Sequence, residues 1–189
     1  MDIFLILKFL HVAAAIVWIG GGFCLVLIAI AADRRQDREE FARVLHSLIL
    51  LAGSVLTPAA VIALLSGLAA TWLSWGFDNL WIILGLIGFA ATFLTGNIFL
   101  TPRAKRMSEI VAREGVSDGA IAIGRELVSL AKFDYVMMFV VVADMVFKPE
   151  PGDWPILSLM AIAMIAGAVL FVAPVLRTGG RSQTTLPVR

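Results

Sequence analysis

Residues 3–32 read IFLILKFLHVAAAIVWIGGGFCLVLIAIAA, an apolar stretch that contains one lysine and one histidine. About 20 apolar residues are enough for an α-helix to cross the ~30 Å hydrocarbon core of a bilayer. Four further stretches reach that length, at Val44–Trp75, Leu80–Thr101, Val128–Phe147 and Trp154–Leu176. Because backbone N–H and C=O groups must be paired internally in lipid, each stretch is expected to be helical. The sequence therefore predicts an all-α polytopic membrane protein with five transmembrane helices, the first four forming a bundle.

The composition agrees with a membrane location and limits the partners. Hydrophobic residues make up 60% of the chain and charged residues only 15%, against about 25% in typical soluble domains. A net charge of +1 gives no reason to expect nucleic acid as a partner. The single cysteine, Cys24, excludes an internal disulfide. The expected partners are the lipid bilayer and either another membrane protein or a second copy of the chain.

The basic residues predict the orientation of the helices. Twelve of the 15 Lys and Arg residues fall in three segments, at 33–43, 102–127 and 177–189. Loops rich in Lys and Arg stay on the cytoplasmic side. The chain is therefore predicted to lie in the inner membrane of a bacterium, with its N-terminus facing out and its C-terminus facing the cytoplasm. A single transmembrane domain is expected over residues 1–176. Residues 177–189 are polar, with glycine and proline, and are predicted to form a disordered cytoplasmic tail.

Small residues recur at four-residue spacing on two of the predicted helices. One set is Ala59, Ala63, Gly67 and Thr71, and the other is Gly88, Thr92 and Gly96. Small residues let helix backbones approach closely in lipid. Both sets are therefore predicted to be packing faces.

The basic segment 102–115 carries apolar residues at helical spacing. These are Met107, Ile110 and Val111. The pattern is typical of an amphipathic helix that lies on the inner membrane surface, but it also fits a solvated linker helix.

Three ionisable residues within the apolar stretches lie at matching depths. Lys8 and His11 are three residues apart and share one helical face, and Asp144 lies near the outer end of the fourth stretch. Counting about 1.5 Å per residue from the outer ends places all three in the outer leaflet. Because an unpaired ionisable group is costly in hydrocarbon, Lys8, His11 and Asp144 are predicted to form one buried polar cluster.

His11 is the candidate ligand for haem or a metal ion. Neutral imidazole is a common metal ligand and an axial ligand of haem iron. Trp18 continues the face of His11, and Met138 lies at the same depth, so these two are the predicted companions of His11 in a cofactor site. A His/Met pair suits haem iron or copper(I). The alternative is a buried histidine whose ring is satisfied by a carbonyl or by Asp144.

Short motifs over about three quarters of the chain carry a resemblance to a known family. They are Leu7–His11, Ile16–Gly21, Pro58, Leu65–Leu68, Trp81, Gly85, Phe133-Asp134 and Met145–Pro149. Together they resemble the bacterial integral-membrane family called domain of unknown function 2269. That resemblance implies a membrane-embedded fold and supplies no activity.

A more distant likeness rests on His11 with Trp18, on Thr57-Pro58 and on Phe147–Pro149. These residues are similar to motifs of the HemJ-type membrane protoporphyrinogen oxidases, and the His11 to Gly20 opening is similar to that of the CopD-type copper-resistance proteins. The first likeness implies haem ligation by His11.

Three hypotheses for the function follow. The first is a haem-binding or redox-associated protein centred on His11. The second is copper or other solute handling through the region of His11 and Asp144, and the third is a non-catalytic subunit of a membrane complex. Whether the protein is an enzyme is left open.

Overall fold

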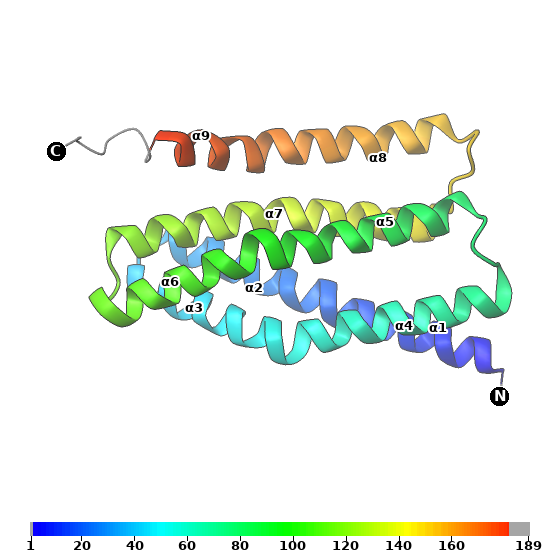
Figure 1. The fold of residues 1–189 in the computed structure, drawn as a ribbon, viewed down its shortest axis with the longest axis horizontal. Helices are drawn as coiled ribbons and strands as arrows, with labels where there is room; N and C mark the ends of the chain where they lie inside the picture. Colours follow the sequence, from blue (N-terminus) through cyan, green and yellow to red (C-terminus); the bar gives the residue numbers. More distant parts are fainter. Residues whose placement is uncertain (1, 182–189) are drawn as a thin grey trace.

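The chain folds into long helices that lie side by side (Figure 1). The computed structural model describes residues 2–181, with the side chains of residues 2–177. Three rods each consist of two α-helices joined by a π-helical segment. They are α1 (Ile3–Ala15), η1 (Ile16–Gly20) and α2 (Gly21–Arg34); α3 (Arg38–Leu51), η2 (Ala52–Leu56) and α4 (Thr57–Ser74); and α5 (Leu80–Leu94), η3 (Thr95–Leu100) and α6 (Thr101–Glu114). The rest is α7 (Asp118–Phe147), then α8 (Trp154–Gly167), η4 (Ala168–Val172) and α9 (Ala173–Arg181). The all-α prediction is confirmed.

Over the described residues, four helical segments are long and apolar enough to cross a membrane. They are Ile3–Arg34, Arg38–Ser74, Leu80–Glu114 and Trp154–Arg177. The fourth predicted span, Val128–Phe147, lies in the helix α7, which is not among the four. The charged residues Lys132, Asp134 and Asp144 interrupt its apolar part. The chain is thus a multi-pass membrane protein with four clear candidate spans.

At the far end of the bundle, the end away from the N-terminus, the helices extend beyond the apolar stretches. The first connection was predicted at residues 33–43, but α3 already begins at Arg38. The Asp37 carboxylate caps α3 by accepting a hydrogen bond from the Glu40 N–H at 2.8 Å, as N-cap residues do. Phe41 and Leu45 of α3 are buried in a core with residues of α2, α6 and α7. This far end is therefore a packed four-helix core.

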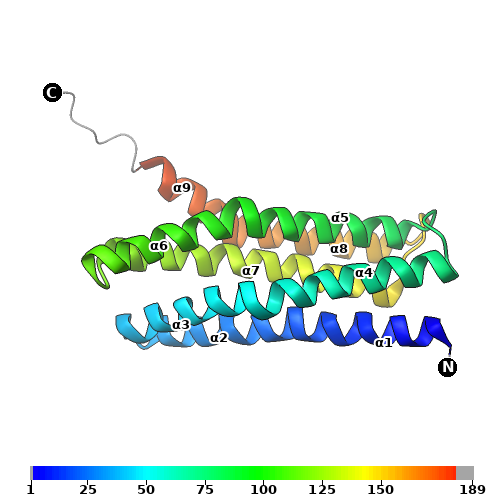
Figure 2. The same cartoon turned by 60° about the horizontal axis from the view of Figure 1, so that its bottom comes forward.

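The basic segment α6 belongs to this core. It continues the rod of α5 and packs against α7 (Figures 1 and 2). Ala104 and Met107 are its buried residues. Packing on α7 uses the apolar face of α6, so this helix does not lie flat as a separate surface helix.

Small residues lie in the contacts of α1 with α4 and of α5 with α7. On α4 the residues Ala59, Ala63, Ala70 and Thr71 are buried, and α4 pairs with α1 along its length. On α5, a Cβ added to Gly88 would collide with Val141 of α7, so the two backbones can approach only because residue 88 is glycine.

Not every predicted small residue takes part in packing. Thr92 is buried, but a Cβ on Gly96 would meet nothing within 4 Å. The packing face of the third rod therefore comprises Gly85, Gly88 and Thr92, shifted toward the N-terminal end of the bundle.

The last rod lies outside the bundle, against α7 (Figure 1). The Ser129 hydroxyl of α7 donates to the Phe171 carbonyl at 2.9 Å, and Gly167 packs against Val136 and Phe133. The helix α9 continues to Arg181, so the first five residues of the predicted tail are helical. The remainder of that tail, 182–189, lies outside the described residues.

Candidate functional site

Two carboxylates on α7 are buried in the bundle. Asp144 is 1% exposed and Asp134 is 6% exposed. Within the described part of the chain, both oxygens of Asp144 and the Oδ1 of Asp134 are buried without a hydrogen-bond partner. Since buried polar groups are nearly always hydrogen-bonded, these carboxylates are the exceptional polar groups of the bundle.

Asp144 faces α5 at a glycine. A Cβ added to Gly85 would stand 3.5 Å from the Asp144 Oδ2 and would collide with the Met145 methyl group. Gly85 is itself buried. The missing side chain at residue 85 therefore makes room for Asp144 and Met145 between α5 and α7.

An aromatic group covers the N-terminal end of the bundle near Asp144. The Lys148 Nζ lies 4.7 Å from the ring centroid of Trp75 and 5.0 Å from that of Trp81, within the range of a cation–π attraction. The two indoles pack edge to face at 5.5 Å, and Phe4 of α1 packs on Trp75 at 5.1 Å. Lys148 ends α7 with a left-handed backbone, and its N–H donates to the Asp144 carbonyl at 2.8 Å. One group of side chains thus joins α1, α4, α5 and α7.

His11 is held against α4. Its Nδ1–H donates to the Ala63 carbonyl at 2.6 Å, and its ring lies over Gly67, where a Cβ would come 2.7 Å from Nδ1. Because a carbonyl only accepts, this bond places a proton on Nδ1, and in the neutral imidazole the lone pair then lies on Nε2. The sequence analysis gave a histidine bonded to a carbonyl as the alternative to a ligand, and His11 makes such a bond here.

The predicted companions of His11 meet in a small apolar cavity among η1, α5 and α7. Trp18 packs on Phe89 with ring centroids 5.4 Å apart. The cavity is lined by Trp18, Ile19, Phe89, Thr92, Met138 and Val141 and has a volume of about 20 Å³. Pockets for organic ligands enclose roughly 300–1,000 Å³, so these residues do not fit a haem as they are arranged.

The structure places the three members of the predicted polar cluster on different neighbours. His11 faces α4 and Asp144 faces α5, while Lys8 is exposed. No hydrogen bond or ion pair joins the three within residues 2–177. Their direct pairing stays a prediction.

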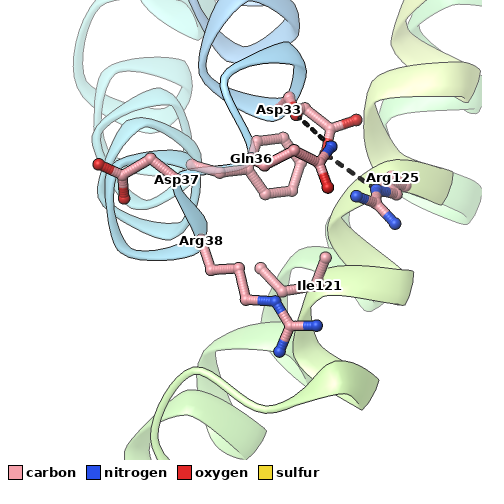
Figure 3. Close-up of a pocket in the computed structure, with 7 residues that line it drawn as sticks. Asp33, Gln36, Asp37, Arg38, Ile121 and Arg125 are labelled. Carbon is pink, nitrogen blue, oxygen red and sulfur yellow. Dashed lines mark hydrogen bonds and ion pairs between the residues drawn. The ribbon is translucent and has the colours of Figure 1, made fainter.

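A second pocket lies at the far end, between the first connection and α7 (Figure 3). It is lined by Asp33, Gln36, Asp37, Arg38, Phe41, Ile121 and Arg125 and has a volume of about 100 Å³. The Arg125 Nε donates to Asp33 at 2.9 Å, and Arg38 pairs with Asp118 at 2.5 Å. The two arginine side chains are more than half exposed and already paired. We therefore assign them to the joint between helices rather than to a ligand.

Sequence reasoning missed the aromatic group and the buried position of Asp134. The signal for the first was present, since Trp75 and Trp81 flank one short connection and tryptophan gathers at membrane interfaces. That they hold Lys148, some 70 residues further on, depends on the pairing of α5 with α7, which spacing alone does not reveal.

These features define an integral membrane protein built as a bundle of long helices. The chain belongs to the family of predicted integral membrane proteins designated domain of unknown function 2269, whose sequence pattern matches residues 5–149. The matched range ends before α8 and so covers the bundle itself. No curated protein and no solved structure matches the chain. The distant HemJ and CopD likenesses are not shown by these comparisons.

Proposed function

We propose that the protein takes up a proton or a small cation within the membrane, with Asp144 as the acceptor. The observation that carries the proposal is that Asp144 is 1% exposed and that neither of its oxygens has a partner in the described chain. An isolated ionised carboxylate in an apolar medium is very costly, so this group must meet a proton or a cation. Carboxylates buried in membrane helices typically mark ion or proton pathways.

The proposal includes a five-pass topology in the bacterial inner membrane, with the N-terminus outside and the C-terminus inside. Two observations support α7 as the fifth span. It runs beside the α5–α6 rod, and α8 starts at the same end of the bundle as α5 (Figure 1). The basic residues of the two far-end connections then lie in the cytoplasm, and Asp144 lies in the outer half of the membrane.

Ion flux into vesicles tests the proposal. The purified protein is reconstituted into liposomes that contain a pH-sensitive dye, and a potassium gradient with valinomycin sets an inside-negative potential. We expect faster internal acidification than in protein-free vesicles, and loss of this difference in Asp144→Asn. The matched control is Asp78→Asn, which removes an exposed carboxylate at the same end.

Parallel vesicles with dyes for sodium and for copper(I) identify the cation if it is not the proton. The proposal would be contradicted if, for every cation, the influx rate were the same in protein-free, wild-type and Asp144→Asn vesicles. Copper handling has weaker support. Among the described residues, no group of three or more His, Cys, Asp or Glu is arranged to hold a metal ion.

The haem hypothesis draws on one favourable observation. The hydrogen bond to Ala63 leaves the Nε2 of His11 as a lone-pair donor, which is how a carbonyl prepares a histidine for ligation. Against this, the cavity beside Trp18 and Met138 holds only about 20 Å³. The geometry therefore supports Asp144 better than His11 as the functional group.

No specific observation favours a non-catalytic subunit or a homo-oligomer. Such association would use exposed apolar faces, and the α8 rod presents one that includes Leu159, Ile162 and Ile165. In a membrane protein, lipid already satisfies exposed apolar faces.

A further inference from the structure

We infer that Trp75 and Trp81 form a clamp that holds the Lys148 ammonium away from Asp144. The clamp thereby keeps the buried carboxylate without a counter-charge. This inference rests on the proposed role of Asp144 and adds a way in which access to it is controlled.

Asp144 and Lys148, the residue that caps α7, both face α5. Asp144 faces Gly85, and Lys148 lies over Trp81. Asp144 and Lys148 are four positions apart, as are Gly85 and Trp81. The two contacts are therefore about one turn, or about 6 Å, apart along the α5–α7 interface.

The Lys148 side chain can reach Asp144. Lys148 caps the C-terminus of α7 with a left-handed backbone, and its N–H bonds to the Asp144 carbonyl one turn earlier at 2.8 Å. A lysine side chain spans one helical turn, so rotation toward the bundle would bring its Nζ to the carboxylate. In the structure the Nζ lies instead over the two indoles.

Few other basic residues lie near the Asp144 carboxylate. The helices α5 and α8 carry no ionisable residue, and the nearby connections add the acidic Asp78, Glu150 and Asp153. On α1, which packs chiefly against α4, Lys8 is exposed and His11 bonds to α4. Lys148 is exposed as well, but it directly follows α7, one turn beyond Asp144. Lys148 is thus the cation whose position decides whether Asp144 is paired.

The clamp is built on the connection between two helices. Trp75 ends α4 and Trp81 lies in the first turn of α5, so the clamp spans the α4–α5 connection. Phe4 supports Trp75 from α1. A movement of this connection would release Lys148. The Lys148 ammonium would then pair with Asp144 and take the place of an incoming cation.

The position of Lys148 can be followed directly by NMR of the full-length protein after ¹³C-dimethylation of its lysines. Methyl groups over indole faces experience ring currents. We expect an upfield-shifted signal that is lost in Lys148→Met, is reduced in Trp75→Leu and in Trp81→Leu, and is unchanged in Asp144→Asn. In Trp75→Leu/Trp81→Leu, the Lys148 signal should become sensitive to a further Asp144→Asn change, because the released ammonium pairs with the carboxylate. If the double variant does not fold, Trp81→Leu, which removes one of the two rings, takes its place in this comparison.

A Lys148 signal without a ring-current shift in the wild type would overturn the inference. So would a double-variant signal that is the same with and without Asp144→Asn. In vesicles, the double variant should lose the cation flux and Lys148→Met in that background should restore it. If the NMR results hold but the wild type shows no flux, the clamp stands and the proposed function fails.

Discussion

The carboxyl group of Asp144 lies against the backbone of Gly85, where an added Cβ would stand 3.5 Å from Oδ2. Both residues are buried in the contact between α5 and α7. A glycine at this point lets a polar group sit between two closely packed helices. The site is therefore a property of the helix contact as well as of the carboxylate.

Gly88→Ala is expected to destabilise the protein. Its new Cβ would collide with Val141, whose branched side chain is stiff about χ1 in a helix and cannot turn away. Overpacking of this kind costs about 1–3 kcal/mol. The measurement is the free energy of unfolding in detergent. Gly96→Ala is the control, because its Cβ meets nothing within 4 Å, and equal losses for the two variants would contradict the predicted contact.

Gly152→Cys is expected to be labelled from outside intact cells. It lies in the connection between α7 and α8, which the five-pass topology places outside. A membrane-impermeant maleimide should react with it in a Cys24→Ser background, whereas Glu114→Cys, at the end of α6, should react only after lysis. Labelling of both positions only after lysis would show that α7 does not cross the membrane.

His11→Ala is expected to lower the free energy of unfolding by about 1 kcal/mol or somewhat more, because it removes the hydrogen bond to Ala63 and the packing over Gly67. His46→Ala changes an exposed histidine of α3 and should have little effect. Thermal unfolding of the two variants beside the wild type measures the difference. Equal stabilities would mean that the contact between α1 and α4 does not depend on His11.

The same two variants test the haem hypothesis. If His11 ligates haem, the purified wild type should show a Soret band that His11→Ala abolishes and His46→Ala leaves unchanged. A wild type without this band, and without uptake of added haem, would end that hypothesis.

Hydrophobic length predicted the helices well because lipid leaves the backbone no alternative. It located the ends less well at the far end of the bundle. The charged residues from Arg38 to Arg43 predict a loop, yet Asp37 caps a helix there and Phe41 is buried among α2, α6 and α7. Amphipathic helices that continue beyond the apolar zone are not visible to a count of apolar residues.

The candidate site shows a second limit. Depth along the membrane normal placed Lys8, His11 and Asp144 at one level, but depth does not specify which way a helix is turned. His11 turns toward Ala63 and Asp144 toward Gly85. Rotation is fixed by helix packing, and that packing depends on small residues and on Val141 and Met145, whose partners the sequence did not identify.

Replacing Asp144 by asparagine tests most directly whether this carboxylate is buried without a partner. Asparagine keeps the shape and removes the charge, so the cost of burying an unsatisfied ionisable group should fall. We expect the free energy of unfolding to rise by about 1–3 kcal/mol, while Asp78→Asn, on the surface, should stay within about 0.5 kcal/mol of the wild type. A decrease of about 3–5 kcal/mol in Asp144→Asn, as found when one partner of a buried ion pair is removed, would contradict the account by showing that Asp144 is already paired.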